Sequence, residues 1–221
     1  MHAVEFACQW AAYFLSNWAF LEVLEYLGVL SVLFGVVFYY SEAGDRLKQK
    51  HYQAWQVINT AQGKGGSGGR IEALQELNQD GVPLVGVDVA GSFLQGIQLR
   101  RAKLLRAVFN AADLRDALLS GSDLQYAQMK SANLRRADLS SVNFLQADLE
   151  DADLVGANLM GANLAGVNLK DADLQDADLK GIHWQAISSV EEANVYGVRR
   201  APEGFVAWAL QHGAVAVRGE E

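Results

Sequence analysis

Residues 147–164 decide the fold, and they read ADLEDADLVGANLMGANL. Leucine recurs every fifth residue, alanine stands two residues before each leucine, and the residue between them is Asp or Asn. Followed outward, this register continues over residues 82–184 as 21 units without an insertion. A large apolar residue occupies every position of the register whose number ends in 4 or 9, from Leu84 to Trp184.

A period of five fits neither an α-helix nor a flat strand. It fits a solenoid in which each unit forms one side of a coil and successive coils stack on each other. The alanine and leucine positions lie two residues apart, so they share the inner side of an extended segment. The Asp or Asn and the two residues after the leucine then face outward. Glycine often stands at the second of these positions, as a tight corner favours.

The string Ala-(Asp/Asn)-Leu-x-x over residues 82–184 resembles the pentapeptide repeat family. The resemblance implies a mainly β fold, a right-handed quadrilateral β-helix with four units to a coil and the alanine and leucine positions inside. The 21 units then make about five coils, a rod roughly 25 Å long at a spacing of ~4.8 Å.

Segments outside the repeat resemble a narrower group of this family, which is bacterial, often cyanobacterial, and carries an N-terminal membrane segment. The resemblance rests on HYQAWQ at residues 51–56, a glycine-rich turn after it, and APEGF at residues 201–205. It implies no biochemical activity.

The N-terminal region, residues 1–45, is the expected membrane segment. One spanning helix is predicted over about residues 18–40, since 23 residues make about 33 Å of helix with aromatic residues at both ends. Glu22 and Glu25 then lie close to one interface. Two alternatives stay open: a buried soluble helix or dimer-forming arm, and a short helical hairpin that turns at these two glutamates.

The distribution of basic residues predicts the orientation. Residues 1–40 contain no Lys or Arg, whereas Arg46, Lys48 and Lys50 follow directly. The positive-inside rule therefore predicts a single-pass protein of the bacterial cell membrane with its solenoid in the cytoplasm. These three membrane-proximal bases are candidates for contact with anionic lipid.

Residues 46–81 connect the membrane segment to the solenoid. We expect a juxtamembrane helix over residues 46–62, which either rests on lipid headgroups or packs on the solenoid. A glycine-rich linker follows, and a helix over residues 70–79 is expected to cap the open N-terminal end of the solenoid.

The β-helix itself is expected over residues 82–198, because residues 193–197 read as one more unit after a one-residue shift. Residues 199–221 are the expected C-terminal cap and tail, with a helix that opens at Pro202 and stops at Gly213.

The sequence carries no signal for catalysis. Its four histidines are scattered without metal-ligand spacing, and the aspartates are explained by the repeat. Cys8 is the only cysteine, so no intramolecular disulfide forms. We therefore expect no enzyme activity, no catalytic residue, no cofactor and no metal. The net charge of −8 argues against nonspecific binding of nucleic acid.

The outward positions show two asymmetries. Residues 100–137 hold eight bases and three acids, a net charge of +5, whereas residues 138–184 hold nine acids and two bases, a net charge of −7. Positions 85, 105, 125, 145 and 165 should stack on one face, and Val85, Leu105 and Leu145 make it a candidate contact face. Its expected cover is either the helix over residues 46–62 or a partner.

These features favour a membrane-anchored, non-enzymatic scaffold for protein interaction, with membrane lipid and an unnamed protein as partners. The alternative is a DNA-mimicking inhibitor of a type II topoisomerase, which the resemblance to other family members suggests and the acidic distal half permits. The sequence carries no signal for an oligomeric state.

Overall fold

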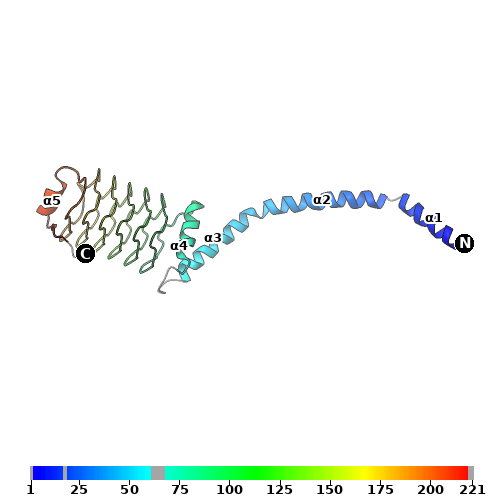
Figure 1. The fold of residues 1–221 in the computed structure, drawn as a ribbon, viewed down its shortest axis with the longest axis horizontal. Helices are drawn as coiled ribbons and strands as arrows, with labels where there is room; N and C mark the ends of the chain where they lie inside the picture. Colours follow the sequence, from blue (N-terminus) through cyan, green and yellow to red (C-terminus); the bar gives the residue numbers. More distant parts are fainter. Residues whose placement is uncertain (1, 17–18, 61–67, 219–221) are drawn as a thin grey trace. The chain divides into compact units, whose positions relative to one another are not determined.

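The computed structural model describes residues 2–16, 19–60 and 68–218 (Figure 1). The helices in these residues are α1 (His2–Ser16), α2 (Ala19–Ser41), α3 (Ala43–Thr60), α4 (Arg70–Gln79) and α5 (Phe205–Gln211). The chain divides into two compact units, Met1–Lys50 and His51–Glu221, which we describe separately.

The first unit contains α1, α2 and the beginning of α3. α2 runs through Glu22 and Glu25 without a break, so a hairpin that turns at these residues does not form. The predicted start of the spanning helix at Trp18 lies outside the described residues. By length and composition, the segment Glu22–Thr60 is the one helix in the described chain that could cross a membrane, and none of its apolar window is buried. A signal sequence passes the same test.

The second unit is a solenoid in which each coil pairs with the next in parallel (Figure 1). Asp88 bridges Val108, and the same spacing of 20 residues continues up to Asn163 and His183, as four units per coil require. After that the spacing becomes 21, because one residue is inserted beyond Trp184. The predicted one-residue shift is confirmed, since Asp173 bridges Asn194.

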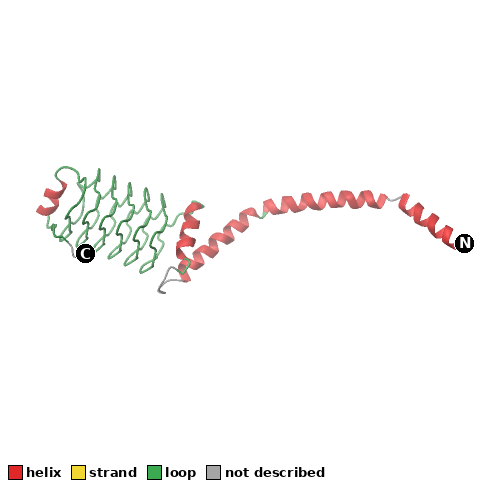
Figure 2. Ribbon diagram, viewed as in Figure 1, coloured by secondary structure: helices red, strands yellow, loops and turns green. Residues whose placement is uncertain are grey.

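The sides of the coils are shorter than strands. Figure 2 shows no strand in the described solenoid, and its pairing consists of isolated bridges at the outward Asp or Asn position. The predicted mainly β fold is therefore formed by isolated β-bridges, without extended strands in the described solenoid. Each unit leaves only three residues between two corners, so a ladder cannot extend along the chain. It extends across coils instead, for example from the Leu154 amide to the Asp173 carbonyl at 2.7 Å.

The interior is formed by the two inward positions of each unit. Between residues 84 and 182, every inward position is at most 4% exposed. From residue 86 to residue 181, the second residue after each inward leucine position is a corner residue with a positive φ. Some of these residues are glycines, such as Gly156 (φ 67°), and others are not, such as Arg101 (φ 55°). The glycines at this position therefore relieve a left-handed conformation that other residues adopt at a cost.

The N-terminal end of the solenoid is closed by α4 together with the second half of α3. Leu74 and Leu77 of α4 and Ile58 of α3 are fully buried in one cluster with the inward leucines. His51 and Asp80 form a hydrogen bond of 2.8 Å between the two helices. The second half of α3 thus packs on the solenoid unit, whereas Leu47 in its first half is 46% exposed.

The C-terminal end of the solenoid is closed by α5 and by the tail after it. Phe205 of α5 is buried, and its ring lies 5.6 Å from the ring of Trp184, the last inward residue of the uninterrupted register. Val215 then forms a bridge to Asn194. The segment predicted as a tail therefore adds one more rung to the stack.

Candidate functional site

The outer surface of the solenoid has four sides, each named here by the column of outward residues that stack on it. Side A carries Asp88, Val108, Gln128, Asp148 and Asn168; side B carries Phe93, Asp113, Asn133, Asp153 and Asp173; side C carries Gln98, Leu118, Asp138, Asn158 and Asp178; side D carries Lys103, Asp123, Asn143, Asn163 and His183. Sides B and D are ten residues apart, half a coil, and so face opposite directions.

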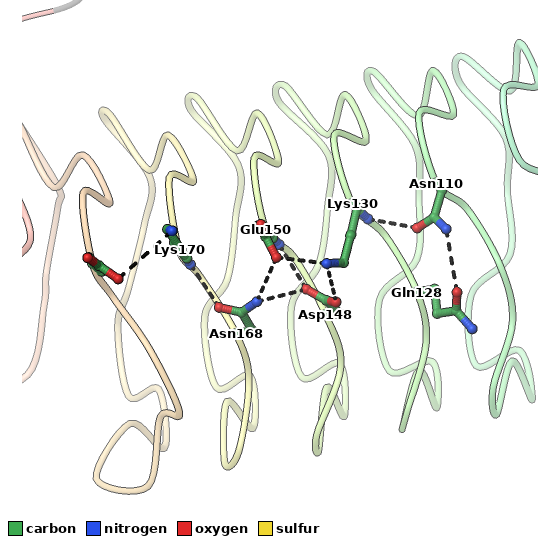
Figure 3. Close-up of polar contacts among 8 residues, drawn as sticks. Asn110, Gln128, Lys130, Asp148, Glu150, Asn168 and Lys170 are labelled. Atoms are coloured by element: carbon green, nitrogen blue, oxygen red, sulfur yellow. Dashed lines mark hydrogen bonds and ion pairs between the residues drawn. The ribbon is translucent and has the colours of Figure 1, made fainter.

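A ladder of alternating charge runs along the corner between sides A and B (Figure 3). The Lys130 Nζ lies 2.7 Å from the Glu150 carboxylate and 3.2 Å from that of Asp148. Asn168 donates its amide to Asp148 at 3.0 Å, and Lys170 lies 4.0 Å from Glu191 in the next coil. The hydrogen bond from Lys130 lowers the pKa of Glu150, and the pKa of Lys130 is raised in turn.

Ion pairs engage four of the eight bases in residues 100–137, namely Arg115, Lys130, Arg135 and Arg136. Arg115 pairs with Asp113 at 2.6 Å, and Arg136 pairs with Asp116 in the preceding coil at 2.8 Å. The hydrogen bonds from these arginines lower the pKa of both carboxyl groups. Counting charge along the sequence missed the pairs Lys130–Glu150 and Arg135–Asp153, because each joins a base of the basic segment to an acid of the acidic segment about 20 residues on.

Acids gather on side B and its corners in the last three coils, where Glu150, Asp153 and Glu191 pair with bases and the other carboxylates form no ion pair with a described residue. Three stretches, residues 150–156, 170–176 and 191–197, contain eight carboxylates and one lysine, a net charge of −7. The carboxylates are Glu150, Asp151, Asp153, Asp171, Asp173, Asp176, Glu191 and Glu192. On side D, the corresponding residues 160–166 and 180–186 contain no acid. The predicted acidic half is therefore acidic chiefly on one side.

Four bases in the first coil lie on side D and form what we name the first-coil basic patch: Arg100, Arg101, Lys103 and Arg106. All four side chains are exposed, and none forms an ion pair with a described residue. The guanidinium of Arg106 lies 5.9 Å from the ring centre of Tyr126 in the next coil. The bases of residues 110–178 all pair with acids; they are Arg115, Lys130, Arg135, Arg136 and Lys170.

The repeat and its stacking geometry decide the family. Eight copies of the family model "Pentapeptide repeats" match the chain, over residues 84–121, 102–140, 117–154 and 143–181. Residues 84–181 belong to the pentapeptide repeat family. Pentapeptide repeat proteins form right-handed β-helix solenoids, and successive coils of this chain pair in parallel.

Several solved pentapeptide repeat structures are similar to this chain. HetL, involved in heterocyst differentiation regulation in the cyanobacterium Nostoc sp. strain PCC 7120, is 23% identical over 54% of this chain and 78% of its own, with a TM-score of 0.21. A protein of the Arabidopsis thaliana thylakoid lumen is 23% identical over 62% and 82%, with a TM-score of 0.26. QnrB1, a plasmid-mediated fluoroquinolone resistance protein, is 15% identical over 61% and 86%, with a TM-score of 0.27. At these identities the likeness concerns the fold alone. The comparison with curated proteins gave no match.

The candidate contact face lies at one corner of the pentapeptide solenoid, between sides D and A. Its residues stack as expected, since the Gly86 amide donates to the Leu105 carbonyl and the Tyr126 amide to the Leu145 carbonyl, each at 2.9 Å. Val85 is 52% exposed, whereas Leu105 and Leu145 are half-buried. α3 therefore leaves Val85 uncovered.

Phe93 is a second exposed apolar residue, 52% exposed on side B in the first coil. Sequence reasoning missed it because it occupies a position where the repeat usually has Asp or Asn. Its departure from that consensus is the signal that could have identified it.

The membrane-proximal bases contact their own helices. Arg46 donates to the Tyr39 carbonyl at 2.7 Å, lies 4.3 Å from the centre of the Tyr39 ring and pairs with Glu42 at 3.7 Å. Lys48 pairs with Asp45 at 3.1 Å. Lys50 belongs to the same helix. Arg46 and Lys48, two of the predicted lipid contacts, are thus partly engaged where α2 passes into α3.

The Asp and Asn residues of the pentapeptide units have a structural role. The Asp153 carboxylate accepts a hydrogen bond from the Val155 amide at 3.1 Å, and the same bond to the residue two positions on recurs in most units. Such bonds satisfy the corner amides. Asn163 also donates to Asn143 of the preceding coil at 2.9 Å. Among the described residues no group of three or more His, Cys, Asp or Glu is placed to hold a metal ion.

Proposed function

We propose that this protein is a membrane-anchored, non-enzymatic scaffold that holds a rigid pentapeptide solenoid at the cytoplasmic face of a bacterial cell membrane. The observation that carries the proposal is α2. Its described side chains, from Glu22 to Ser41, are all exposed, and large apolar residues lie on every face of it. A helix with apolar residues all round needs an apolar environment, and the described chain provides none for α2.

The proposed orientation follows from Arg46, Lys48 and Lys50, which directly follow the apolar helix. Basic residues within a short distance of a spanning helix favour the cytoplasmic side. The solenoid follows these residues in the chain and would therefore lie on the same side of the membrane.

The scaffold role rests on the surface of the solenoid. Hydrogen bonds and ion pairs between coils hold the outward residues in fixed columns, so each side offers a partner a flat and preorganised surface. We propose that a protein partner contacts the corner of Val85, Leu105 and Leu145, because Val85 is left exposed by α3.

Two measurements on the intact chain test the anchor. Alkaline carbonate extraction should leave the protein in the membrane fraction, and a reporter fused after residue 60 should be active only in the cytoplasm. Recovery of the intact chain in the soluble fraction rejects the anchor, whereas a periplasmic reporter signal reverses the orientation alone.

The DNA-mimicking alternative is favoured by one observation, the net charge of −7 on side B and its corners in the last three coils. A topoisomerase supercoiling assay separates it from the scaffold. The soluble fragment for this assay should begin at His51, because Ile58 of α3 is part of the core that α4 closes. Inhibition that disappears when Asp151, Asp171 and Asp176 are replaced by Asn supports the mimic; no inhibition rejects it.

A further inference from the structure

The first-coil basic patch differs from every other basic region of the solenoid. Residues 100–106 read RRAKLLR and hold four bases and no acid. On the opposite side of the same coil, residues 90–96 contain no charged residue at all. Within residues 110–178 every base pairs with an acid of the same or a neighbouring coil. The largest cluster of bases without an acidic partner in the described solenoid thus lies on one side, in one coil.

The one acid stacked on the patch is not placed to neutralise it. Asp123 bridges Lys103 through the backbone, but its carboxylate accepts hydrogen bonds from the amide and the side chain of Gln125, at 3.3 and 3.1 Å. One carboxylate also cannot balance four bases. The patch therefore keeps a positive field toward solvent.

An aromatic side chain borders the patch. Tyr126 is 43% exposed beneath the Arg106 guanidinium. Arginine and lysine beside aromatic and aliphatic groups suit the interfacial region of a bilayer, where the charges meet headgroups and the rings lie at their level.

The chain keeps this coil near a membrane if α2 spans one, and this step rests on the anchor proposed above. Only nine residues, 42–50, lie between Ser41 and the start of the solenoid unit at His51. Nine residues reach at most about 30 Å. Such a tether gives the solenoid a high effective concentration of lipid headgroups, so that even a weak contact is populated.

We propose that Arg100, Arg101, Lys103 and Arg106 bind the anionic headgroups of phospholipids and turn side D of the solenoid toward the bilayer. The acidic side B, which faces the opposite direction, is repelled by the same surface. The basic patch and the acidic side B favour the same orientation. A half-turn of the solenoid about its long axis would bring side B to the bilayer and replace the attraction with a repulsion. A free polyanion such as nucleic acid lacks the tether and meets a chain whose net charge is −8.

The test uses the full chain in nanodiscs, with Cys8→Ala and a single new cysteine for a fluorophore. Ser141 and Ser131 form a matched pair: both are exposed corner residues with φ of 55° and 54°, on opposite corners that border sides D and B. The discs contain phosphatidylcholine with or without phosphatidylserine, and a headgroup-linked quencher. The expected result is stronger quenching at Ser141→Cys than at Ser131→Cys, only with phosphatidylserine, and its loss at high salt.

Two patch variants decide whether these bases are responsible. Neutralising all four (R100Q/R101Q/K103Q/R106Q) should abolish the difference between the two labels, and each single neutralisation should weaken the docking equilibrium about fivefold. The charge-preserving R100K/R101K/R106K should retain it. An unchanged thermal midpoint shows that folding is intact, and R100Q or K103Q alone serves if the quadruple variant does not fold.

Equal quenching of the two labels, or quenching that ignores phosphatidylserine or the neutralised patch, overturns the proposal. If the chain is not retained in nanodiscs at all, the membrane anchor fails instead. Cosedimentation of the same chain with phosphatidylserine vesicles then tests the patch alone: binding that needs the four bases upholds it, and no binding overturns it.

Discussion

α2 and the interior of the solenoid are both built from large apolar side chains, but one exposes them and the other buries them. Leu30 and Phe34 of α2 are 49% and 66% exposed. In the solenoid the inward residues between positions 84 and 182 are at most 4% exposed. Apolar content alone therefore does not say whether a segment is covered by its own chain.

The difference arises from periodicity. In the solenoid a fixed period of five directs each leucine toward the leucine of the next coil, so every apolar residue has a neighbour of the same kind. In α2 the apolar residues surround the helix, and no described segment of the chain covers it. Burial of one leucine is worth about 1.5–3 kcal/mol. α2 thus requires an external apolar environment, whereas the solenoid carries its own.

The largest expected effect comes from a charge in the solenoid interior. Leu154→Lys places an ammonium group at a fully buried position without an acidic partner, and the free energy of unfolding should fall by several kcal/mol. Gln175→Lys, on an outward corner, is the matched control and should be close to neutral. Thermal unfolding monitored by circular dichroism measures both. Equal midpoints for the two variants contradict the register.

The same charge in α2 should leave the solenoid folded and weaken the anchor. Leu30→Lys lies near the middle of α2, where a lysine costs about 3 kcal/mol of membrane insertion. The share of the chain that resists carbonate extraction should fall, while the thermal midpoint of the solenoid stays unchanged. Gln49→Lys, an exposed position in α3, controls for added charge. Equal membrane retention of both variants argues that α2 does not span.

Much of the solenoid could be predicted from the sequence, because its period states which residues face inward. The corners, the one-residue shift after Trp184 and the apolar helix were readable in the same way. The rung formed by Val215 was not, since the tail carries no Ala-Asp-Leu string. The packing of Ile58 was left open between two alternatives, because an amphipathic helix suits a membrane surface and a protein core equally.

The surface was less predictable than the interior. Charge counted along the chain gives a basic half and an acidic half, but each side chain meets residues about 20 positions away. Lys130 with Glu150 and Arg135 with Asp153 join the two halves and reduce the predicted contrast along the rod. What remains is a contrast between sides B and D, which depends on the coil geometry and on side-chain direction.

A smaller effect is expected at Arg70, which interrupts the apolar boundary between α4 and the first coil. It is 1% exposed; it donates to the Ser92 hydroxyl, but its Nε and second terminal nitrogen have no hydrogen-bond partner. A buried charge without a full set of partners adds little stability. Arg70→Met should leave the free energy of unfolding unchanged or raise it by about 1 kcal/mol.

After Arg70→Met the Ser92 hydroxyl loses its hydrogen bond to the guanidinium, but it can donate to a backbone carbonyl instead. Ser122, at an equivalent inward position, donates to the carbonyls of Leu99 and Leu119 at 2.7 and 2.6 Å. Leu74→Ala serves as the control, because a cavity in the same cap should cost about 2–5 kcal/mol. Chemical denaturation measures both variants. A loss of more than 1 kcal/mol for Arg70→Met shows instead that the guanidinium stabilises the cap.

The smallest expected effect lies on the outside of the solenoid, in the pair of Lys130 and Glu150. The folded state holds the pKa of Glu150 below its usual value, so its contribution to stability is complete above that usual value of about 4.3 and is lost as the pH falls through the folded pKa. The thermal midpoint of the natural chain should therefore fall more between pH 6 and pH 3 than that of Glu150→Gln, by about a degree. Lys130→Gln breaks the same pair and should show the same reduced dependence on pH. If neither variant is less sensitive to acid than the natural chain, the pair of Lys130 and Glu150 in Figure 3 contributes nothing to stability, and the backbone and the Asp and Asn side chains hold the outer columns of the solenoid in place.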